Sequence, residues 1–321
     1  MIGLILSLLG QTAPPLPAAL PCTAAETAEL TAASDQPVLL ACRAVLSPDT
    51  RVTRRIVIEG EGASGAGIDC RGGALGVAGA ATTTRAPTVY IVSQADGTGW
   101  RRPTDVRIEN CTVHGAIRIW GMGAGGSMRD LLPSSRTAGH TAAAQAAAPT
   151  RIQLTNLTFA ATGSIPLYVG PGVTRVSVQQ PRFTGRSVST AVYLDAESAE
   201  NAITGGVFDI RTGREMIAVD GSARNRITGN RFALRGRGGV FLYRNCGEDG
   251  VIRHQTPSGN TITDNVFTSA GWFRRRAVVV GAREGNRRYC RDDAGWPFGS
   301  SADDGDHATG NIVAGNTVSR F

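Results

Sequence analysis

The sequence predicts an all-β fold in which the chain winds into a parallel β-solenoid. A short phrase of the form Asn-x-Ile-Thr-x-x-x-Phe, or a close variant, returns four times in the second half of the chain. The first two copies start 24 residues apart, which is about the length of one solenoid coil. The later copies are farther apart, which indicates loops inserted between coils. The four copies begin at Asn201, Asn225, Asn260 and Asn311.

Each copy has the alternation of a half-buried strand. Isoleucine and phenylalanine can point inward while their polar neighbours point outward. Equal positions of successive coils stack at about 4.8 Å and form ladders. We expect asparagines at the bends to adopt the left-handed conformation and to hydrogen-bond to their copies above and below. One predicted ladder is Asn201, Asn225, Asn260 and Asn311, and the other is Asn230, Asn265 and Asn316.

Weaker copies extend the pattern upstream. Strand-like runs lie at 55–60, 106–111, 151–154 and 175–178. Phenylalanines recur with spacings of 24, 25 and 24 residues at Phe159, Phe183, Phe208 and Phe232. The solenoid is therefore predicted over 51–321, and the Ala-rich segment 22–50 is expected to cap its open end against edge-to-edge association. A Gly- and Ala-rich insertion at 121–150 is expected either to cover a cleft or to be a disordered loop.

On this repeat, which covers about 51–321, the chain resembles the right-handed parallel β-helix proteins of the pectate-lyase-like superfamily. The resemblance implies a single-stranded right-handed parallel β-helix with a short N-terminal cap. It is specific for the fold and not for the reaction, because the superfamily includes polysaccharide lyases, glycoside hydrolases, uronate epimerases and non-catalytic adhesins. Its calcium-dependent lyases use acidic Ca²⁺ ligands and an arginine, and this chain contains those residue types without matching the motif.

The chain is basic and contains no lysine. All 33 basic residues are arginine, and the formal net charge is +7. Lysine is therefore excluded as a general base or Schiff-base nucleophile. A basic balance suits acidic partners, and the arginines are dispersed with no nucleic-acid motif. The expected partner is an anionic polysaccharide and not a nucleic acid, and the sequence leaves the oligomeric state open.

The N-terminus and the cysteines predict a secreted or periplasmic protein. Residues 1–21 begin with an apolar run followed by Pro and Ala, which is typical of a secretory signal peptide. The run is too short to span a bilayer, and no other membrane span is predicted. Six cysteines, an even number, suit an oxidising compartment. Sequential pairing predicts the disulfides Cys22–Cys42, Cys70–Cys111 and Cys246–Cys290, with free buried thiols as the alternative.

Two aspartates end neighbouring strands of the repeat. Aligning the strands stacks Asp195 beside Asp220, about 5 Å apart, and carboxylates this close need a cation, a proton or an arginine. They can bind Ca²⁺ together with Glu197, form the acid–base pair of a glycoside hydrolase, or pair structurally with an arginine. The candidate arginines are Arg214, Arg224 and Arg244. The same column is expected to continue through Tyr243 or Arg244 to Arg283.

A second cluster of chemically versatile side chains follows at once in the sequence. Arg244 and Arg253 can hold a substrate carboxylate through paired hydrogen bonds. His254 titrates near neutrality and can serve as an acid or a base. Tyr243 can donate a proton to a leaving glycosidic oxygen. The alternative is a disulfide-anchored loop with surface arginines.

The leading hypothesis is an exported enzyme that cleaves an acidic, uronate-containing polysaccharide by β-elimination. The carboxylate cluster would hold Ca²⁺, the only cofactor predicted, or an arginine against the uronate carboxylate. Arg244 or His254 would be the base and Tyr243 the acid. The further substrate-binding residues would be Glu197, Arg253 and Arg283. Hydrolysis by the two aspartates is the second hypothesis, and a non-catalytic glycan-binding or surface-structure protein is the third.

Overall fold

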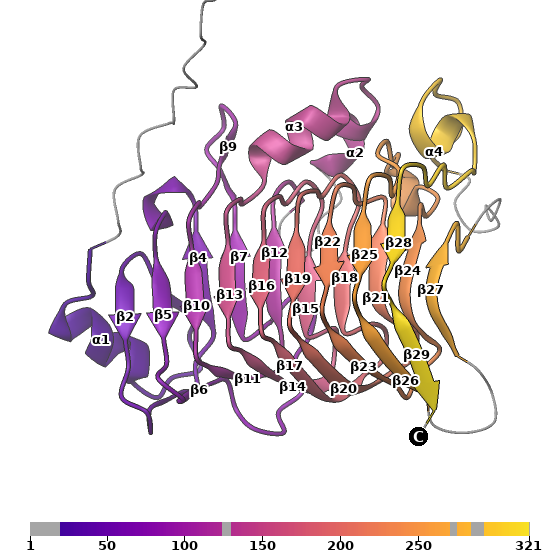
Figure 1. Cartoon of the computed structure of the whole chain (residues 1–321). Coiled ribbons are helices and arrows are strands. Elements are labelled where there is room, and N and C mark those ends of the chain that lie inside the picture. The colour runs from indigo at the N-terminus through magenta and orange to yellow at the C-terminus, as the bar shows by residue number, and fades with distance from the viewer. Residues whose placement is uncertain (1–19, 124–129, 270–274, 284–291, 321) are drawn as a thin grey trace, which may run out of the picture.

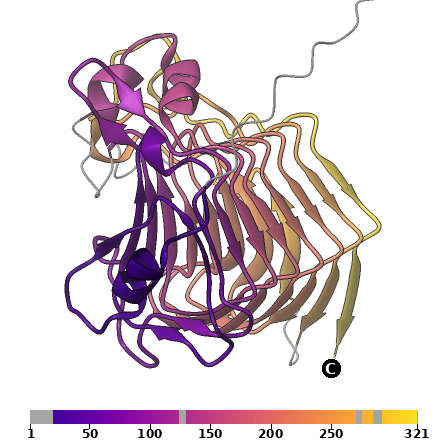
Figure 2. The ribbon, with the colours of Figure 1, turned by 90° about the vertical axis from the view of Figure 1, so that its left-hand side faces the viewer.

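The computed structural model describes residues 20–123, 130–269, 275–283 and 292–320. In this part of the chain the backbone coils around three parallel sheets of nine strands each (Figure 1). Each strand pairs with the equivalent strands of the preceding and following coils, and the fold is a right-handed parallel β-helix. The predicted fold class is therefore confirmed. Figure 2 views the stack from its N-terminal end, where the coils superpose.

The three sheets take one strand each from every coil. Sheet I contains β1 (Val38–Leu39), β4 (Ile56–Glu59), β7 (Val89–Val92), β12 (Ile117–Trp120), β15 (Leu167–Val169), β18 (Val192–Leu194), β21 (Glu215–Asp220), β24 (Gly238–Tyr243) and β27 (Arg276–Val280). Sheet II contains β2 (Arg43–Val45), β5 (Gly67–Asp69), β10 (Arg107–Glu109), β13 (Gln153–Thr155), β16 (Ser177–Gln179), β19 (Ala202–Thr204), β22 (Arg226–Thr228), β25 (Thr261–Thr263) and β28 (Ile312–Ala314). Sheet III contains β3 (Arg51–Val52), β6 (Ala74–Leu75), β11 (Thr112–His114), β14 (Thr158–Gly163), β17 (Arg182–Ser187), β20 (Val207–Thr212), β23 (Arg231–Leu234), β26 (Val266–Ser269) and β29 (Thr317–Arg320).

The interior is organised as ladders of identical side chains. The repeated phenylalanines stack face to face with ring centroids 4.5–4.7 Å apart. Such aromatic pairs add about 0.5–1.5 kcal/mol each beyond the burial of their area. The ladder is Phe159, Phe183, Phe208, Phe232 and Phe267, and all five side chains are buried. The sequence spacing of the phenylalanines thus predicted a real stack.

Both predicted asparagine ladders are confirmed. The side-chain amide of Asn225 donates to Asn260 Oδ1 at 2.8 Å, and that of Asn230 donates to Asn265 Oδ1 at 3.0 Å. The same oxygens also accept the backbone N–H of the preceding coil. The expected left-handed backbone at these asparagines is wrong, because the residue before each takes the positive φ, as at Arg224 (54°). The turn is therefore made one residue earlier, and the asparagine side chain is left to point inward.

Two of the predicted disulfides are present at the N-terminal end. Cys22 bonds to Cys42 and Cys70 bonds to Cys111. The third predicted pair includes Cys290, which lies outside the described residues, as do residues 1–19 of the expected signal peptide. The segment before the first coil forms α1 (Ala24–Thr31), which begins with a capping box and lies at the N-terminal end of the solenoid (Figure 2).

The larger additions to the coils share one edge of the solenoid. Each lies between a strand of sheet I and the next strand of sheet II, and we call this the excursion edge. It carries η1 (Glu61–Ala63), the antiparallel hairpin of β8 (Gln94–Ala95) and β9 (Trp100–Arg101), α2 (Leu131–Ser135), α3 (His140–Ala147), η3 (Glu248–Gly250) and α4 (Gly299–Ala302). Figure 1 shows α2, α3, α4 and β9 along this edge. The expected insertion at 121–150 thus contains two helices, α2 and α3, in its described part. No helix in the described chain is long and apolar enough to cross a membrane.

Candidate functional site

The outer face of sheet I carries two neighbouring columns of polar and aromatic side chains. The register pairs Leu194 with Val219, and Asp220 with Tyr243. Because Asp195 directly follows Leu194, Asp195 and Asp220 stack one coil apart, as the sequence alignment predicted. The second column holds Tyr168, Tyr193, Ala218 and Phe241. These rings form an apolar layer outside the main core.

Asp195 and Asp220 are joined by a buried arginine, and we call these three residues the buried cluster. Arg253 Nη1 lies 2.7 Å from Asp195 Oδ1 and 3.2 Å from Asp220 Oδ2. The three residues are 4%, 0% and 7% exposed. Pairing with an arginine was one of the three interpretations, but the expected partners were wrong. Arg253 comes from the excursion after β24 and is buried against both aspartates. Because its guanidinium is already paired and enclosed, the predicted role in holding a substrate carboxylate is not supported.

Hydrogen bonds fill the remaining acceptor positions of the two carboxylates. The hydroxyl of Tyr168 donates to Asp195, and that of Tyr193 donates to Asp220. The backbone N–H and the side-chain amide of Asn245 both donate to Asp220, at 2.8 and 2.7 Å. Burial raises the pKa of Asp220, and Arg253 offsets only part of that rise. A carboxylate pair so enclosed has no surface to offer to a polysaccharide.

Glu197 belongs to a different set of contacts. Its carboxylate accepts the Thr141 hydroxyl and the backbone N–H groups of His254 and Gln255. It therefore fastens α3 and the excursion after β24 to the coil. Among the described residues, no group of three or more His, Cys, Asp or Glu side chains is placed to hold a metal ion. The expected Ca²⁺ set of Asp195, Glu197 and Asp220 does not fit this arrangement, because each member already has its own donors.

The two predicted bases are also engaged in holding excursions together. His254 Nε2 donates to the Ser135 carbonyl at 2.6 Å, which leaves no lone pair on that nitrogen. Arg244 Nη2 pairs with Asp303 Oδ1 at 2.8 Å, and the Arg244 backbone N–H donates to Asp306. These contacts anchor the loop, as the alternative interpretation expected, but the expectation of surface arginines is wrong, because Arg244 and Arg253 are buried. The predicted roles as proton acceptors stay without structural support.

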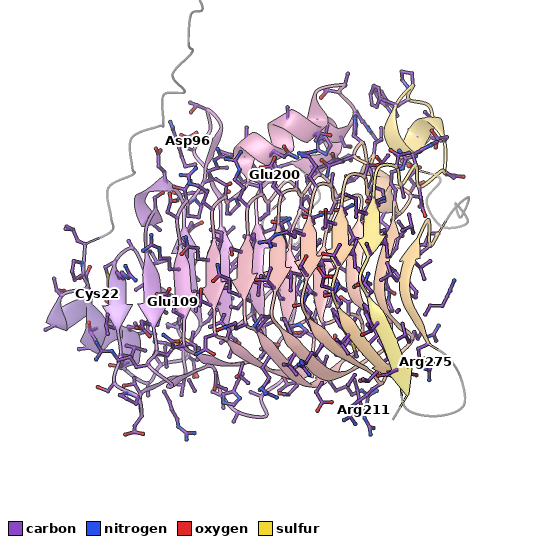
Figure 3. The ribbon with its side chains drawn as sticks, in the orientation of Figure 1. Cys22, Asp96, Glu109, Glu200, Arg211 and Arg275 are labelled. Atoms are coloured by element: carbon purple, nitrogen blue, oxygen red, sulfur yellow. A yellow bond between two sulfur atoms is a disulfide. The ribbon has the colours of Figure 1, made fainter. Side chains whose placement is uncertain are left out.

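A separate pocket of about 640 Å³ opens on the outer face of sheet I at the last described coils. Five arginines line it, and we call it the arginine pocket. The arginines are Arg214, Arg237, Arg275, Arg276 and Arg283. Four of them lie at or just before the start of consecutive strands: Arg214 precedes β21, Arg237 precedes β24, and Arg275 and Arg276 precede and begin β27. The register sets Glu215 opposite Gly238 and Gly238 opposite Arg276. Figure 3 labels Arg275 toward the C-terminal end of the solenoid.

The floor of the arginine pocket is a tyrosine–carboxylate pair. Tyr243 donates its hydroxyl proton to Glu215 Oε1 at 2.8 Å, and Arg214 donates to both residues. Burial raises the pKa of Tyr243, and the charges of Asp220 and Glu215 raise it further. Burial lowers the pKa of Arg214, but Tyr243 and Glu215 outweigh that effect, so the net shift is upward. Tyr243 is therefore protonated at neutral pH.

Arg283 reaches this pocket from a position other than the predicted one. Leu242 pairs with Val280, so Gly281 lies opposite Tyr243 and Arg283 is two residues farther along. Its guanidinium lies 4.5 Å from the centroid of the Tyr243 ring. The sequence interpretation named Arg214 only as a possible partner of the two aspartates, and it missed Arg237, Arg275 and Arg276 as site residues. Their signal was an arginine just before three consecutive strands of sheet I, β21, β24 and β27, which becomes visible only once the strands are in register.

One further charged residue of the outer face was also missed. Arg118 is 2% exposed and its guanidinium lies 4.9 Å from the Tyr168 ring centroid. Burial lowers the pKa of Arg118, while Tyr168 and Tyr90 act in the opposite direction. Its Nε has no hydrogen-bond partner among the described residues. Arg118 lies on β12, three coils before β21, where the arginine pocket begins, and it takes no part in that pocket.

Comparison with known proteins gives only distant structural likenesses. No family model matches the sequence, and no curated protein matches it. An alginate lyase from Paenibacillus sp. str. FPU-7 superposes with a TM-score of 0.34 at 11% identity, covering 80% of this chain and 95% of that one. ORF18 of Geobacillus virus E2 gives a TM-score of 0.28 at 12% identity, covering 90% and 54%. The Dettilon tailspike protein gp208 gives 0.25 at 11% identity, covering 77% and 60%.

Proposed function

We propose that this protein binds an acidic, uronate-containing polysaccharide in the arginine pocket and cleaves it by β-elimination. One observation carries the proposal: five guanidinium groups surround a single tyrosine–carboxylate pair in one open pocket. Guanidinium groups hold carboxylates through paired, directional hydrogen bonds. In the described chain neither Arg237 nor Arg275 has a carboxylate partner, and both side chains are exposed, so both are available to an anionic ligand.

The reaction needs a base for the C5 proton and an acid for the leaving O4. The Glu215 carboxylate takes the proton from C5, the C4–O4 bond breaks, and a double bond forms between C4 and C5. Tyr243 gives its hydroxyl proton to O4. The proton on Glu215 then passes to the Tyr243 oxygen across their 2.8 Å hydrogen bond, which restores both groups.

The arginines supply the electrostatic part of catalysis. Negative charge spreads from C5 onto the uronate carboxylate as the proton leaves. Cations fixed beside that carboxylate stabilise the developing charge more than the starting one, which lowers the barrier. The positive field of Arg283 over the Tyr243 ring acts in the same sense, because it stabilises the tyrosinate formed when O4 is protonated.

The buried cluster does not support the alternative of hydrolysis by Asp195 and Asp220, because both carboxylates are enclosed and paired with Arg253. One observation favours the alternative of a non-catalytic glycan-binding protein. Tyr243 is 1% exposed and Glu215 is 6% exposed, so a bound glycan can reach only the edges of the two groups proposed to catalyse the reaction. Measuring turnover distinguishes the enzyme from the binding protein. The two disulfides suit the proposed secreted or periplasmic location.

The test is incubation of the full chain with uronate-containing and neutral glycans, with and without Ca²⁺, followed by mass measurement of the products. We expect unsaturated products, each lighter than its hydrolytic counterpart by one water. Tyr243→Phe and Glu215→Gln should each lower the turnover rate by about 100-fold or more. Arg237→Gln should chiefly raise KM. Wild-type turnover in Tyr243→Phe, or fully hydrated products, would refute the mechanism.

The matched control is Arg224→Gln. Arg224 is an exposed arginine paired with Glu200 at 3.4 Å on another side of the solenoid. Its loss removes one positive charge, as Arg237→Gln does, without touching the arginine pocket. We expect unchanged kinetics for the control. Equal effects of the two substitutions would show that net charge, and not the pocket, attracts the polymer. Binding without cleavage across the panel would establish the non-catalytic function instead.

A further inference from the structure

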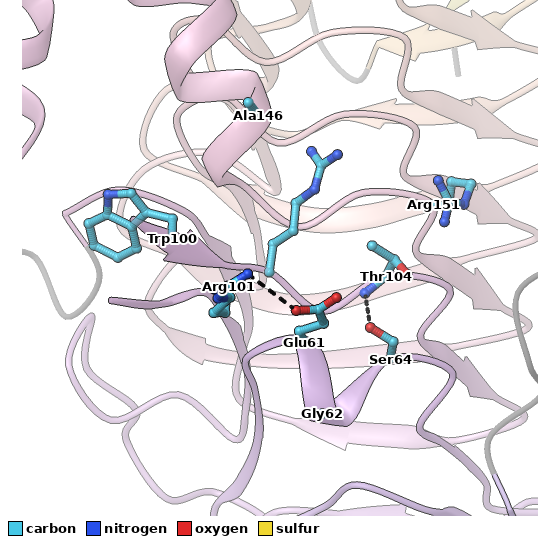
Figure 4. A pocket seen from close by; sticks show the side chains of 9 residues that line it. Glu61, Gly62, Ser64, Trp100, Arg101, Thr104, Ala146 and Arg151 are labelled. Atoms are coloured by element: carbon cyan, nitrogen blue, oxygen red, sulfur yellow. Dashed lines mark hydrogen bonds and ion pairs between the residues drawn. The ribbon is translucent and has the colours of Figure 1, made fainter. Parts of the chain in front are cut away.

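A second pocket, of about 580 Å³, lies on the excursion edge near the other end of the solenoid. It is built by η1, the β8–β9 hairpin and α3, and we call it the hairpin pocket. Figure 4 shows Trp100 and Arg101 on the hairpin, Glu61 and Ser64 below them, and Ala146 on the helix above. The arginine pocket involves none of these elements.

The hairpin is held rigid by its own turn. Asp96 accepts the N–H and hydroxyl of Thr98, the N–H of Gly99 and Arg101 Nε, all within 2.6–2.9 Å. Hydrogen bonds from Thr98 are the main reason that the pKa of Asp96 lies well below its usual range. The carboxylate is therefore charged, and the turn stays closed, over the whole neutral range. The hairpin presents Trp100 and Arg101 in a fixed geometry, which removes an ordering cost from binding.

One cation of the hairpin pocket lacks a counter-ion. Arg151 is paired with Asp105 through two hydrogen bonds, at 2.8 and 2.7 Å, and Arg101 is paired with Asp96. Within the described residues Arg102 has no carboxylate partner and donates only to carbonyl oxygens, among them that of Gln145 at 2.6 Å. Burial lowers the pKa of Arg102, and repulsion from Arg151 and Arg175 lowers it further. A bound anion would offset both effects, because its charge favours the protonated guanidinium.

The other lining groups suit a sugar. The Trp100 ring is half-buried, and its N–H has no partner among the described residues. An indole face packs on the apolar C–H face of a sugar ring and leaves its edge to hydrogen-bond. Ser64 and Thr104 add hydroxyl groups to the lining, joined by a 3.2 Å bond from the Thr104 N–H. A half-buried aromatic ring, a guanidinium without a carboxylate partner among the described residues, and neutral hydroxyls together match one acidic monosaccharide unit.

We infer that the hairpin pocket is a second glycan-binding site, which holds a uronate unit with its ring on Trp100 and its carboxylate on Arg102. The inference rests on the proposed function only for the identity of the polymer. A long chain held here while another segment occupies the arginine pocket gains affinity by effective concentration. A short oligomer cannot bridge the two pockets and gains nothing.

The test uses a protein whose first site is disabled by Arg237→Gln and Arg275→Gln. Short oligomers of galacturonate and of mannuronate are titrated into this background by calorimetry, with neutral glucose oligomers as the comparison. We expect one remaining site for the acidic oligomers. Adding Trp100→Ala or Arg102→Gln should weaken it by about tenfold or more, Trp100→Phe should retain most of the affinity, and Arg224→Gln should change nothing.

Two outcomes would overturn the inference. The first is that the background variant binds no acidic oligomer. The second is that it binds an acidic oligomer with an affinity that Trp100→Ala and Arg102→Gln leave unchanged. Neither outcome depends on catalysis, because the measurement is binding. Conversely, if the wild-type protein cleaves no glycan while the background variant binds oligouronate through Trp100, the elimination mechanism fails and the hairpin pocket stands as a glycan-binding site.

Discussion

Removing the cation of the buried cluster should destabilise the protein strongly. In Arg253→Gln, Asp195 and Asp220 lose a guanidinium at 2.7 and 3.2 Å and remain buried beside each other. At an effective dielectric constant of about 20, each contact is worth about 5–6 kcal/mol before the desolvation of the arginine is subtracted. Breaking one side of a buried ion pair costs about 3–5 kcal/mol in practice. We expect a loss within that range.

The assay combines chemical denaturation with amide hydrogen exchange. A solenoid can lose cooperativity along its axis, so a local probe is needed beside the global one. The Asn245 N–H donates to Asp220 Oδ1 at 2.8 Å and reports directly on the cluster. Its exchange should accelerate in Arg253→Gln. The control Arg224→Gln removes an exposed ion pair and should cost under about 1 kcal/mol.

The stability loss in Arg253→Gln should depend on pH, because the charge of Asp220 depends on pH. Burial already raises the pKa of Asp220 in the folded protein, so its protonation favours the folded state, and this contribution is lost as pH rises through the folded pKa. Without Arg253 the pKa rises further. The deficit of Arg253→Gln should therefore be largest at neutral pH and should shrink toward about pH 4, where carboxyl groups protonate. A deficit below about 1 kcal/mol, or one that is independent of pH, would refute the electrostatic account.

Three further substitutions test the ladders and the buried arginine, each by the midpoint of chemical unfolding. Phe208→Ala should cost about 3–5 kcal/mol, because it leaves a cavity in the middle of a continuous ring stack; a loss below about 1 kcal/mol would show that the coils collapse around it. Asn230→Ala should cost about 2–4 kcal/mol, because it removes the acceptor of the Gly206 N–H and the donor to the Ile203 carbonyl inside the solenoid; a loss below about 1 kcal/mol would show that the ladder adds little to stability. Arg118→Met should leave stability unchanged or raised, since it replaces a buried cation that has no ion pair in the described chain; a clear loss would show that the contact with Tyr168 is stabilising.

The parts of the fold that sequence could predict are those that repeat. A ladder requires the same side chain at the same place in successive coils. The spacing of Phe208 and Phe232 is therefore enough to predict that they stack. The same logic found the contact between Asp195 and Asp220. The prediction failed at the backbone of the asparagine ladders, because the left-handed turn residue varies from coil to coil. Arginine, glutamate, glutamine, glycine and aspartate occupy that position in different coils, and asparagine occupies it only at Asn110 and Asn156, outside the two ladders.

The parts that sequence could not predict come from the excursions. Arg253 reaches Asp195 because the segment after β24 folds back over the edge of the sheet, and no periodicity governs that path. For the same reason His254 was predicted as an acid or base and Glu197 as a Ca²⁺ ligand and substrate-binding residue, since polar residues in a loop resemble a site until their partners are known. The arginine pocket was missed because Arg237 and Arg275 directly precede β24 and β27, and the long segment between these strands hides their common register.

Tyr243 lies between the buried cluster and the arginine pocket, so the charge of the buried cluster affects the proposed proton donor. It lies opposite Asp220 in the register, while its hydroxyl reaches Glu215 on the pocket side. The buried cluster has two carboxylates and one guanidinium, so its excess negative charge acts on Tyr243 across a medium that screens little. Together with burial this raises the pKa of Tyr243. Tyrosine is protonated at neutral pH even at its ordinary pKa, and the excursion that buries Asp220 extends this protonated range to higher pH. Protonated tyrosine is the state that a donor to a leaving oxygen must have.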